Sequence, residues 1–241
     1  MVMEFNPDKC EVIRFTNKRR PIDATYSIHG KPLARVDEAK YLGVRLHHKL
    51  QWKPHVEAIS KKANSTRAFL QRNLRGCPAA TKDQCYKSFV RPILEYASTT
   101  WDPCGNGGGS NRQRLEGVQR RCARFVTGDW RRTSSVSAMM AQLNWASLAE
   151  RRAHAKVHMM YNIFHGHVDI PASVYLIPTT STYSTRGAHA KFLVPYARLL
   201  VYKNSFIPSA ISLWNRLPAS VSSAASAETF KARAAAITFT H

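Results

Sequence analysis

The stretch that decides the fold begins with Lys40-Tyr41-Leu42-Gly43-Val44-Arg45-Leu46, continues through Gln51-Trp52-Lys53-Pro54-His55-Val56, and leads into a segment that ends near Leu74. We predict a short strand with Tyr41, Leu42 and Val44, a turn, and a helix that Pro54 opens, because proline in a first helical turn sacrifices no hydrogen bond. Helical spacing then separates an apolar face from a basic face. The apolar face holds Val56, Ile59, Ala63, Leu70 and Leu74, and the basic face holds Lys61, Ser65, Arg72 and Arg75.

The charges of this predicted helix are strongly one-sided. Seven Lys or Arg residues lie between Lys49 and Arg75, and Glu57 alone opposes them. Like charges at four-residue spacing repel by a few tenths of a kcal/mol per pair, roughly. The segment is either a solvated helix surface, which is the common role of charge runs, or a surface that meets a polyanion. The sign balance favours the polyanion.

Composition sets the limits on fold and partners. The chain has 241 residues, 44% of them hydrophobic, and 36 Lys and Arg against 15 Asp and Glu, for a formal charge of +21. It is long enough to bury one or two cores, and its field attracts nucleic acid first and an anionic membrane surface second. No apolar run reaches the length of a spanning helix, and Met1 to Pro7 does not resemble a signal peptide. We expect an intracellular protein of the nucleus or cytoplasm, without a membrane partner.

The whole chain is predicted to be mainly α, with a small N-terminal β element at residues 1–50, a basic helical bundle at 51–130 and a smaller helical domain at 131–241. Strands are expected at Glu11 to Thr16 and Tyr26 to Ile28. Ser147 and Glu150 have capping-box spacing at the start of a helix that stops near Gly166. The remaining expectations are a helix around Pro92 that carries Tyr86 and Trp101, a helix from about Arg112 to Val126, a Pro/Ser/Thr-rich linker near 170–186, a strand at Arg198 to Tyr202, and helices at Phe206 to Arg216 and Glu228 to Ala236.

Other catalytic or metal-binding patterns are weak. The five cysteines, at positions 10, 77, 85, 104 and 122, contain no C-x-x-C pair, so we expect reduced thiols and no zinc site. The loop from Gly105 to Ser110 lacks the ending of a phosphate-binding loop. His154 and His158 have a spacing that can bind metal, but no intervening Glu accompanies them, which favours solvent-facing or capping histidines. Aromatic residues at helical spacing, among them Trp214, are assigned to core packing, whereas Tyr41 and Trp52 fit stacking on nucleic acid equally well.

Several motifs, in order, resemble non-LTR retrotransposon (LINE-type) reverse transcriptases over nearly the whole chain. They are Asn6-Pro7-Asp8-Lys9-Cys10-Glu11, Tyr41-Leu42-Gly43-Val44, Val90-Arg91-Pro92-Ile93-Leu94-Glu95-Tyr96-Ala97, Trp101-Asp102-Pro103 and Leu115-Glu116-Gly117-Val118-Gln119-Arg120-Arg121. Leu213-Trp214-Asn215-Arg216-Leu217-Pro218 and Glu228-Thr229-Phe230-Lys231 are similar to the closing part of those polyproteins. The resemblance rests on several motifs that follow one another in the same order as in that family.

The resemblance implies a place for each segment. Lys9 matches the lysine of the last palm motif, which lies near the incoming nucleotide. Tyr41, Leu42, Gly43 and Val44 match the primer grip, and the helices that follow match the thumb. Polymerisation needs closely placed carboxylates for two Mg²⁺ ions. The seven aspartates here include no adjacent pair, so we expect the metal-binding palm motifs to lie before residue 1, with no catalytic residue, metal site or cofactor in this chain.

The predicted function is binding of RNA or an RNA/DNA hybrid through phosphate contacts, as the non-catalytic part of an RNA-directed DNA polymerase. The candidate residues are Lys61, Lys62, Arg72, Arg75, Arg120, Arg121, Arg124 and Trp52. A further partner is the missing palm and fingers segment. Two alternatives stay open: a non-functional relic of a truncated element, and a helical interaction module recruited by the host. The sequence does not determine the oligomeric state.

Overall fold

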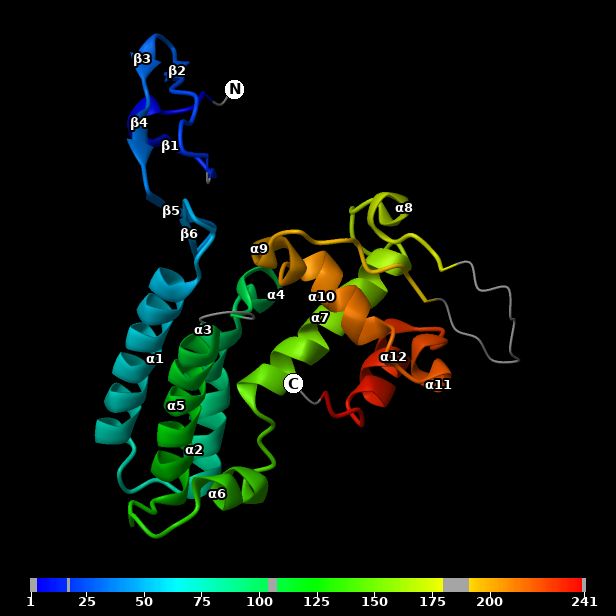
Figure 1. The fold of residues 1–241 in the computed structure, drawn as a ribbon. Coiled ribbons are helices and arrows are strands. Elements are labelled where there is room, and N and C mark those ends of the chain that lie inside the picture. The colour runs from blue at the N-terminus through cyan, green and yellow to red at the C-terminus, as the bar shows by residue number, and fades with distance from the viewer. Residues whose placement is uncertain (1–3, 17, 104–107, 180–190, 240–241) are drawn as a thin grey trace. The chain divides into compact units, whose positions relative to one another are not determined.

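The computed structural model describes residues 4–16, 18–103, 108–179 and 191–239. They form two compact units, Met1–Ile59 and Ser60–His241, and the chain is mainly helical with short strands in the first unit (Figure 1). The predicted fold class is therefore confirmed. Cys104, the start of the glycine-rich loop at 105–107 and the linker residues 180–186 lie outside the described residues. The thiols of Cys10, Cys77, Cys85 and Cys122 are free.

The first unit contains three separate two-stranded ladders. After the 3₁₀ turn η1 (Pro7–Lys9), β1 (Glu11–Ile13) pairs in parallel with β4 (Ala34–Val36), and β2 (Ser27–Ile28) pairs antiparallel with β3 (Lys31–Pro32). The third ladder is the antiparallel hairpin of β5 (Glu38–Tyr41) and β6 (Val44–His47). The predicted small N-terminal β element is therefore confirmed, and it consists of three two-stranded sheets.

The Tyr41 to Val44 segment is a hairpin turn. Tyr41 ends β5, Val44 begins β6, and the two residues between them have positive φ angles, 44° at Leu42 and 86° at Gly43. Two consecutive positive φ angles suit the tight turns whose twist matches that of the flanking strands. The prediction of one strand through Tyr41, Leu42 and Val44 was wrong, because an alternating apolar pattern does not reveal a two-residue turn inside it.

A buried histidine ties this hairpin to the start of the long helix α1 (Lys53–Asn73). The Nδ1 atom of His55 accepts a hydrogen bond of 3.2 Å from the backbone N–H of Arg45 on β6. Burial, and secondarily the positive charge of Arg45, lowers the pKa of His55 to about 4. The neutral ring is therefore the form that holds the hairpin against the first turn of α1.

The second unit begins with the rest of α1, followed by α2 (Ala79–Cys85), the π-helical turn η2 (Tyr86–Val90), α3 (Arg91–Glu95) and α4 (Ser98–Trp101). Pro92, expected inside one kinked helix, sits in the first turn of α3, directly after η2. Proline cannot donate to the preceding turn, and the wider π turn accommodates the lost bond. Helices α5 (Gly108–Thr127) and α6 (Val136–Gln142) follow, and α2 and α5 pack together.

The C-terminal part of this unit surrounds the helix α7 (Leu148–Phe164), which Ser147 caps by accepting a hydrogen bond from the Glu150 N–H, as predicted. Tyr161, Trp214 and Phe230 stack in its core, with 4.4 Å between the ring centroids of Tyr161 and Phe230. Tyr86 and Trp101 are also buried, which confirms their assignment to core packing. The shorter helices are α8 (Ala172–Tyr175), α9 (Leu200–Lys203), α10 (Phe206–Trp214), α11 (Ala219–Ser222) and α12 (Ala227–Ala234).

The segment from Leu200 to Lys203 is helical. The predicted strand at Arg198 to Tyr202 was wrong: residues 200–203 form α9, whose turn satisfies the backbone locally, through the N–H of Lys203 and Asn204 donating to Leu199 and Leu200. The expected domain boundary near residue 130 stays a prediction, and α7 packs against α4 and α5 within the one compact unit. Among the described residues, no helix has the length and apolar character needed to cross a membrane.

Candidate nucleic-acid interface

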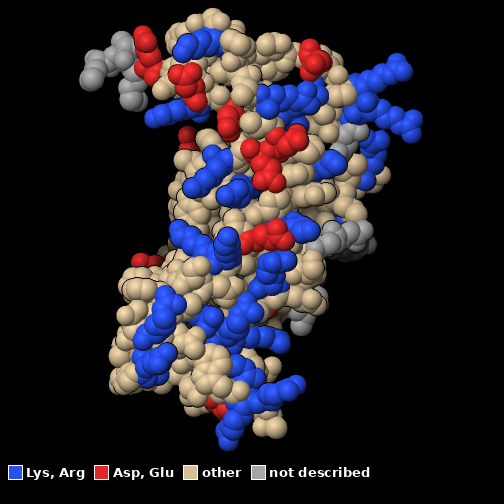
Figure 2. Space-filling model, turned by 90° about the vertical axis from the view of Figure 1, so that its left-hand side faces the viewer, with Lys and Arg blue, Asp and Glu red and all other residues tan. Residues whose placement is uncertain are grey.

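Helix α1 presents an exposed basic face in the second unit. Lys61, Lys62 and Arg72, with Arg75 just after the helix, are exposed, while Ala63 and Leu70 are buried. The separation of faces follows the helical period of the sequence. Figure 2 looks onto the side of the molecule that carries α1, and Lys and Arg outnumber Asp and Glu over its helical part. This is the arrangement that a phosphate-binding surface requires.

Helix α5 adds a second set of cations next to α1. Its buried side is apolar and includes Leu115, Val118 and Cys122, while Arg120 and Arg121 are exposed. The Nε atom of Arg121 donates a hydrogen bond of 3.2 Å to Oδ1 of Asn64 on α1. Since Asn64 lies within one turn of Lys61, this contact brings cations of two helices together on one surface.

Arg67 lies at the junction of the two helices and was missed by sequence reasoning. Burial raises the pKa of Cys122 on α5 to about 12, and the nearby charges of Arg67 and Arg121 partly oppose that rise. Arg67 also donates to the Gln71 side chain one turn further along α1. Its position between two basic helices has no signal in the linear pattern, because it depends on where α5 packs. The high pKa leaves the Cys122 thiol protonated and unreactive.

Arg124 has a different environment from the other candidates. Its guanidinium donates to three backbone carbonyls beyond the end of α5, those of Asp129 at 3.2 Å, Arg131 at 2.9 Å and Ser134 at 3.4 Å. These bonds close the loop that leads to α6. We therefore assign Arg124 to the fold and leave it out of the interface.

Several acidic residues of the helical unit are used in contacts within the fold. Glu116 on α5 accepts the N–H groups of Leu148 and Ala149 at the start of α7, where a carboxylate also meets the positive end of the helix dipole. Glu95 pairs with Arg151, and Asp83 accepts from the Trp145 indole and pairs with Lys87. Asp129 bonds to Arg131 and Ser134, which holds its pKa well below the ordinary range. These contacts leave the exposed cations of α1 with few acidic neighbours.

Phe69 is a second residue that sequence reasoning missed. It is 57% exposed on α1, seven residues after Lys62 and three before Arg72, a spacing that places all three on one side of the helix. The helical spacing alone assigns such aromatics to a core. Its exposure among cations instead suits stacking on a base.

Lys9, the predicted primer-grip residues and Trp52 lie in the first unit. Lys9 is exposed at the end of η1. In the hairpin turn, Tyr41 and Leu42 are exposed and Gly43 has positive φ, whereas Val44 is buried and Trp52 is half-buried. These residues belong to the first compact unit, together with the part of α1 before Ser60. The candidate cations of α1 and α5 belong to the second unit.

The histidines of α7 line a core edge. The ring of His154 lies against Phe239, 5.0 Å between centroids, and that of His158 lies near Phe230. Burial lowers the pKa of both. Within the described ranges, no group of three or more His, Cys, Asp or Glu side chains is placed to hold a metal ion.

Comparison with known proteins finds two similar transposon proteins. The chain is 30% identical over 129 residues to a probable RNA-directed DNA polymerase from transposon X-element of Drosophila melanogaster, and 29% identical over 130 residues to one from transposon BS of the same fly. About half of this chain is therefore similar in sequence to two RNA-directed DNA polymerases of transposons. Each match covers 52% of the chain and 14% of the relative, so the chain corresponds to a small part of those polymerases. This confirms, over about half of the chain, the resemblance to retrotransposon reverse transcriptases noted in the sequence.

No model of a known protein family matches the chain, and no solved structure matches it either. The relationship therefore rests on the two transposon polymerases and on the order of the motifs.

Proposed function

We propose that the helical unit of this reverse transcriptase relative binds RNA, or an RNA/DNA hybrid, through phosphate contacts. The observation that carries the proposal is the exposed basic face formed by α1 and α5, while Glu116, Glu95 and Asp83 of the same unit are used in internal contacts. The exposed cations of this face are Lys61, Lys62, Arg72, Arg75, Arg120 and Arg121. Exposed cations of this kind contact phosphates and read little sequence.

The family relationship gives this surface a role. The relatives are named as RNA-directed DNA polymerases, and such an enzyme must hold a template and a primer. We propose that α1 and α5 act as a thumb-like element on that duplex. In the other unit, the hairpin turn with Tyr41 and Leu42 would contact the primer end, and Lys9 would lie near the incoming nucleotide. The nucleus or cytoplasm, where such substrates occur, is the compartment that this role requires.

We further propose that this chain by itself does not polymerise DNA. Two-metal phosphoryl transfer needs carboxylates close together, and none of the seven aspartates has an aspartate neighbour in sequence. The Mg²⁺ ions would be held by a palm and fingers segment supplied as a partner. An inactive relic or a host interaction module are the alternatives, and they differ from the proposal in requiring no nucleic-acid affinity.

The test is binding of the purified 241-residue chain to a labelled RNA/DNA hybrid at a fixed, moderate salt concentration. The variant Lys61→Gln/Arg72→Gln/Arg75→Gln should bind about tenfold more weakly or worse, since three phosphate contacts are lost. The matched control, Lys191→Gln/Arg198→Gln/Lys231→Gln, removes three exposed cations of the same unit and should bind within about twofold of the unmodified chain. Equal losses in both variants, with circular dichroism unchanged, would reduce the binding to net charge and overturn the proposed site.

A further inference from the structure

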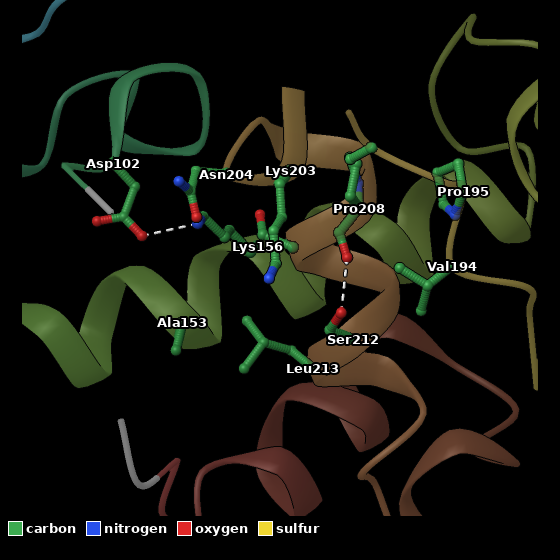
Figure 3. Close-up of a pocket in the computed structure, with 12 residues that line it drawn as sticks. Asp102, Ala153, Lys156, Val194, Pro195, Lys203, Asn204, Pro208, Ser212 and Leu213 are labelled. Atoms are coloured by element: carbon green, nitrogen blue, oxygen red, sulfur yellow. Dashed lines mark hydrogen bonds and ion pairs between the residues drawn. The ribbon is translucent and has the colours of Figure 1, made fainter. Parts of the chain in front are cut away.

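The second unit contains a cavity of about 370 Å³ between α7, α9 and α10 (Figure 3). Lys156 of α7 lies at one side, Lys203 and Asn204 come from the end of α9, and Ser212 comes from α10. Asp102, which follows α4, completes this polar side. The cavity is separate from the exposed face of α1 and α5, and nothing in the proposed function uses it.

The polar side of the cavity is built on a buried ionic cluster. Asp102 contacts Arg152 at 2.8 Å through one carboxylate oxygen and Lys156 at 2.7 Å through the other. The side chains of Asp102, Arg152 and Lys156 are 7%, 1% and 3% exposed. One carboxylate thus faces two buried cations. Buried charges are costly unless each is compensated, so this cluster carries an excess positive charge.

Two further observations indicate that this positive charge is not compensated by another side chain. The Nη1 and Nη2 atoms of Arg152 are buried and find no hydrogen-bond partner in the described part of the chain. The segments outside the described ranges contain no Asp or Glu, so no side-chain carboxylate is hidden there. Buried donors of this kind are usually satisfied by a bound group or by ordered water. Lys156, Lys203 and Asp102 line the cavity and leave one positive charge on its wall. Arg152 does not line the cavity, and it adds a second positive charge behind the wall through its contact with Asp102.

The hydrogen-bonding groups around the cavity favour an acceptor as ligand. The hydroxyls of Ser209 and Ser212 donate to the carbonyls of Ser205 and Pro208, at 2.7 and 2.9 Å, so their hydrogens are not available to a ligand. The donors that face the cavity come from Lys156, Lys203 and Asn204. An ammonium carries three hydrogens, so Lys156 is able to bind Asp102 and an anion together.

The other side of the cavity is apolar, with Val194, Pro195, Pro208 and Leu213 (Figure 3). We propose that the cavity binds a phosphate monoester whose organic part lies against this apolar side. A phosphate monoester carries close to two negative charges at neutral pH, which matches the two excess positive charges, whereas a carboxylate supplies one. The phosphate could belong to a free nucleotide or to the phosphorylated end of a nucleic-acid strand.

The test is calorimetric titration of the full chain with AMP at constant ionic strength, with adenosine as the uncharged comparison. Lys203→Gln should weaken AMP binding about tenfold, the effect expected for one charge-assisted hydrogen bond. Ser212→Phe, which fills the cavity from its exposed side, should abolish it. The control Lys191→Gln and the α1 variant Lys61→Gln/Arg72→Gln/Arg75→Gln should leave AMP affinity unchanged.

The result that would overturn the proposal is AMP affinity that is insensitive to Lys203→Gln and Ser212→Phe, or that disappears in the α1 variant, since either places the anion elsewhere. Failure here is distinguishable from failure of hybrid binding, which depends on the α1 residues. The source of the phosphate follows from competition by a short strand carrying a 5′-phosphate or a 5′-hydroxyl. Displacement of AMP by the phosphorylated strand alone identifies a strand end, and displacement by neither identifies a free nucleotide.

Discussion

Lys61 on α1 and Lys156 on α7 carry the same ammonium group and have opposite surroundings. Lys61 is exposed on a face with few acidic neighbours, whereas Lys156 is buried against Asp102. The same contrast holds for Arg72 and Arg152. A formal charge of +21 therefore describes two populations of cations, one that belongs to the fold and one that is available to a partner. The position of the nearest carboxylate, which packing decides, separates them.

The largest expected effect on stability comes from removing the carboxylate that pairs with the buried cations. Asp102→Asn removes the one carboxylate between Arg152 and Lys156 and leaves two buried cations uncompensated. We expect the free energy of unfolding to fall by about 3–5 kcal/mol, measured by urea denaturation. Asp102→Asn/Lys156→Met should lose less than Asp102→Asn alone. A single variant as stable as the unmodified chain would show that the cluster does not need its carboxylate.

The carboxylate of Glu116 tests whether acidic residues are reserved for the fold. It accepts the N–H groups of Leu148 and Ala149 at 3.3 and 2.8 Å. Glu116→Gln keeps the shape and loses the charge, so stability should fall by about 1 kcal/mol, and Glu116→Ala should lose more. Denaturation of the two variants side by side checks the order. If both variants were as stable as the unmodified chain, Glu116 would not stabilise the start of α7. The small number of acidic residues on the α1 face would then need another cause.

The periodic parts of the fold were predictable from sequence, and the parts made by distant contacts were not. Val56, Ala63 and Leu70 on α1 and Leu115, Val118 and Cys122 on α5 are buried as their spacing predicted. The turn at Leu42 and Gly43 and the helix α9 were missed, because short segments take their conformation from local turn geometry and available pairing partners.

The candidate site shows the same limit. The exposure of Lys61 and Arg72 follows from helical period, whereas the use of Arg124 by the loop after α5 does not. Asp102 and Arg152 are 50 residues apart in sequence, so no local pattern announces their pairing. Arg67 was missed for the same reason, because its position depends on where α5 packs, whereas Phe69 was missed because an aromatic residue at helical spacing suggests a core.

A pH titration tests the role of His55 in the first unit, where its neutral ring accepts a hydrogen bond from the Arg45 amide. The pKa of His55 is lowered to about 4, so the folded form binds a proton less readily than the unfolded chain, whose histidine has its ordinary value of 6.5. Its contribution to stability is complete above the unfolded value and is lost as the pH falls from there toward 4. Protection of the Arg45 amide against hydrogen exchange, corrected for the intrinsic rate, should decline over that range. In His55→Gln the decline should be absent.

The smallest effect on stability is expected on the exposed face. Phe69→Ala should change the free energy of unfolding by less than about 0.5 kcal/mol, as substitutions at exposed sites usually do. Its affinity for a single-stranded RNA should nevertheless fall by about 1–3 kcal/mol, the value of one stacked base. Fluorescence anisotropy and urea denaturation on the same sample separate the two quantities. A loss of stability without a loss of affinity would assign Phe69 to packing.

The most direct test of the central claim is the salt dependence of hybrid binding, plotted as the logarithm of affinity against the logarithm of salt concentration. The slope reports the number of phosphates neutralised, with about one unit for each contact. We expect a steep negative slope for the unmodified chain and a slope shallower by roughly three units for Lys61→Gln/Arg72→Gln/Arg75→Gln. Parallel lines for the two proteins would contradict the account, because the exposed cations of α1 would then make no phosphate contacts.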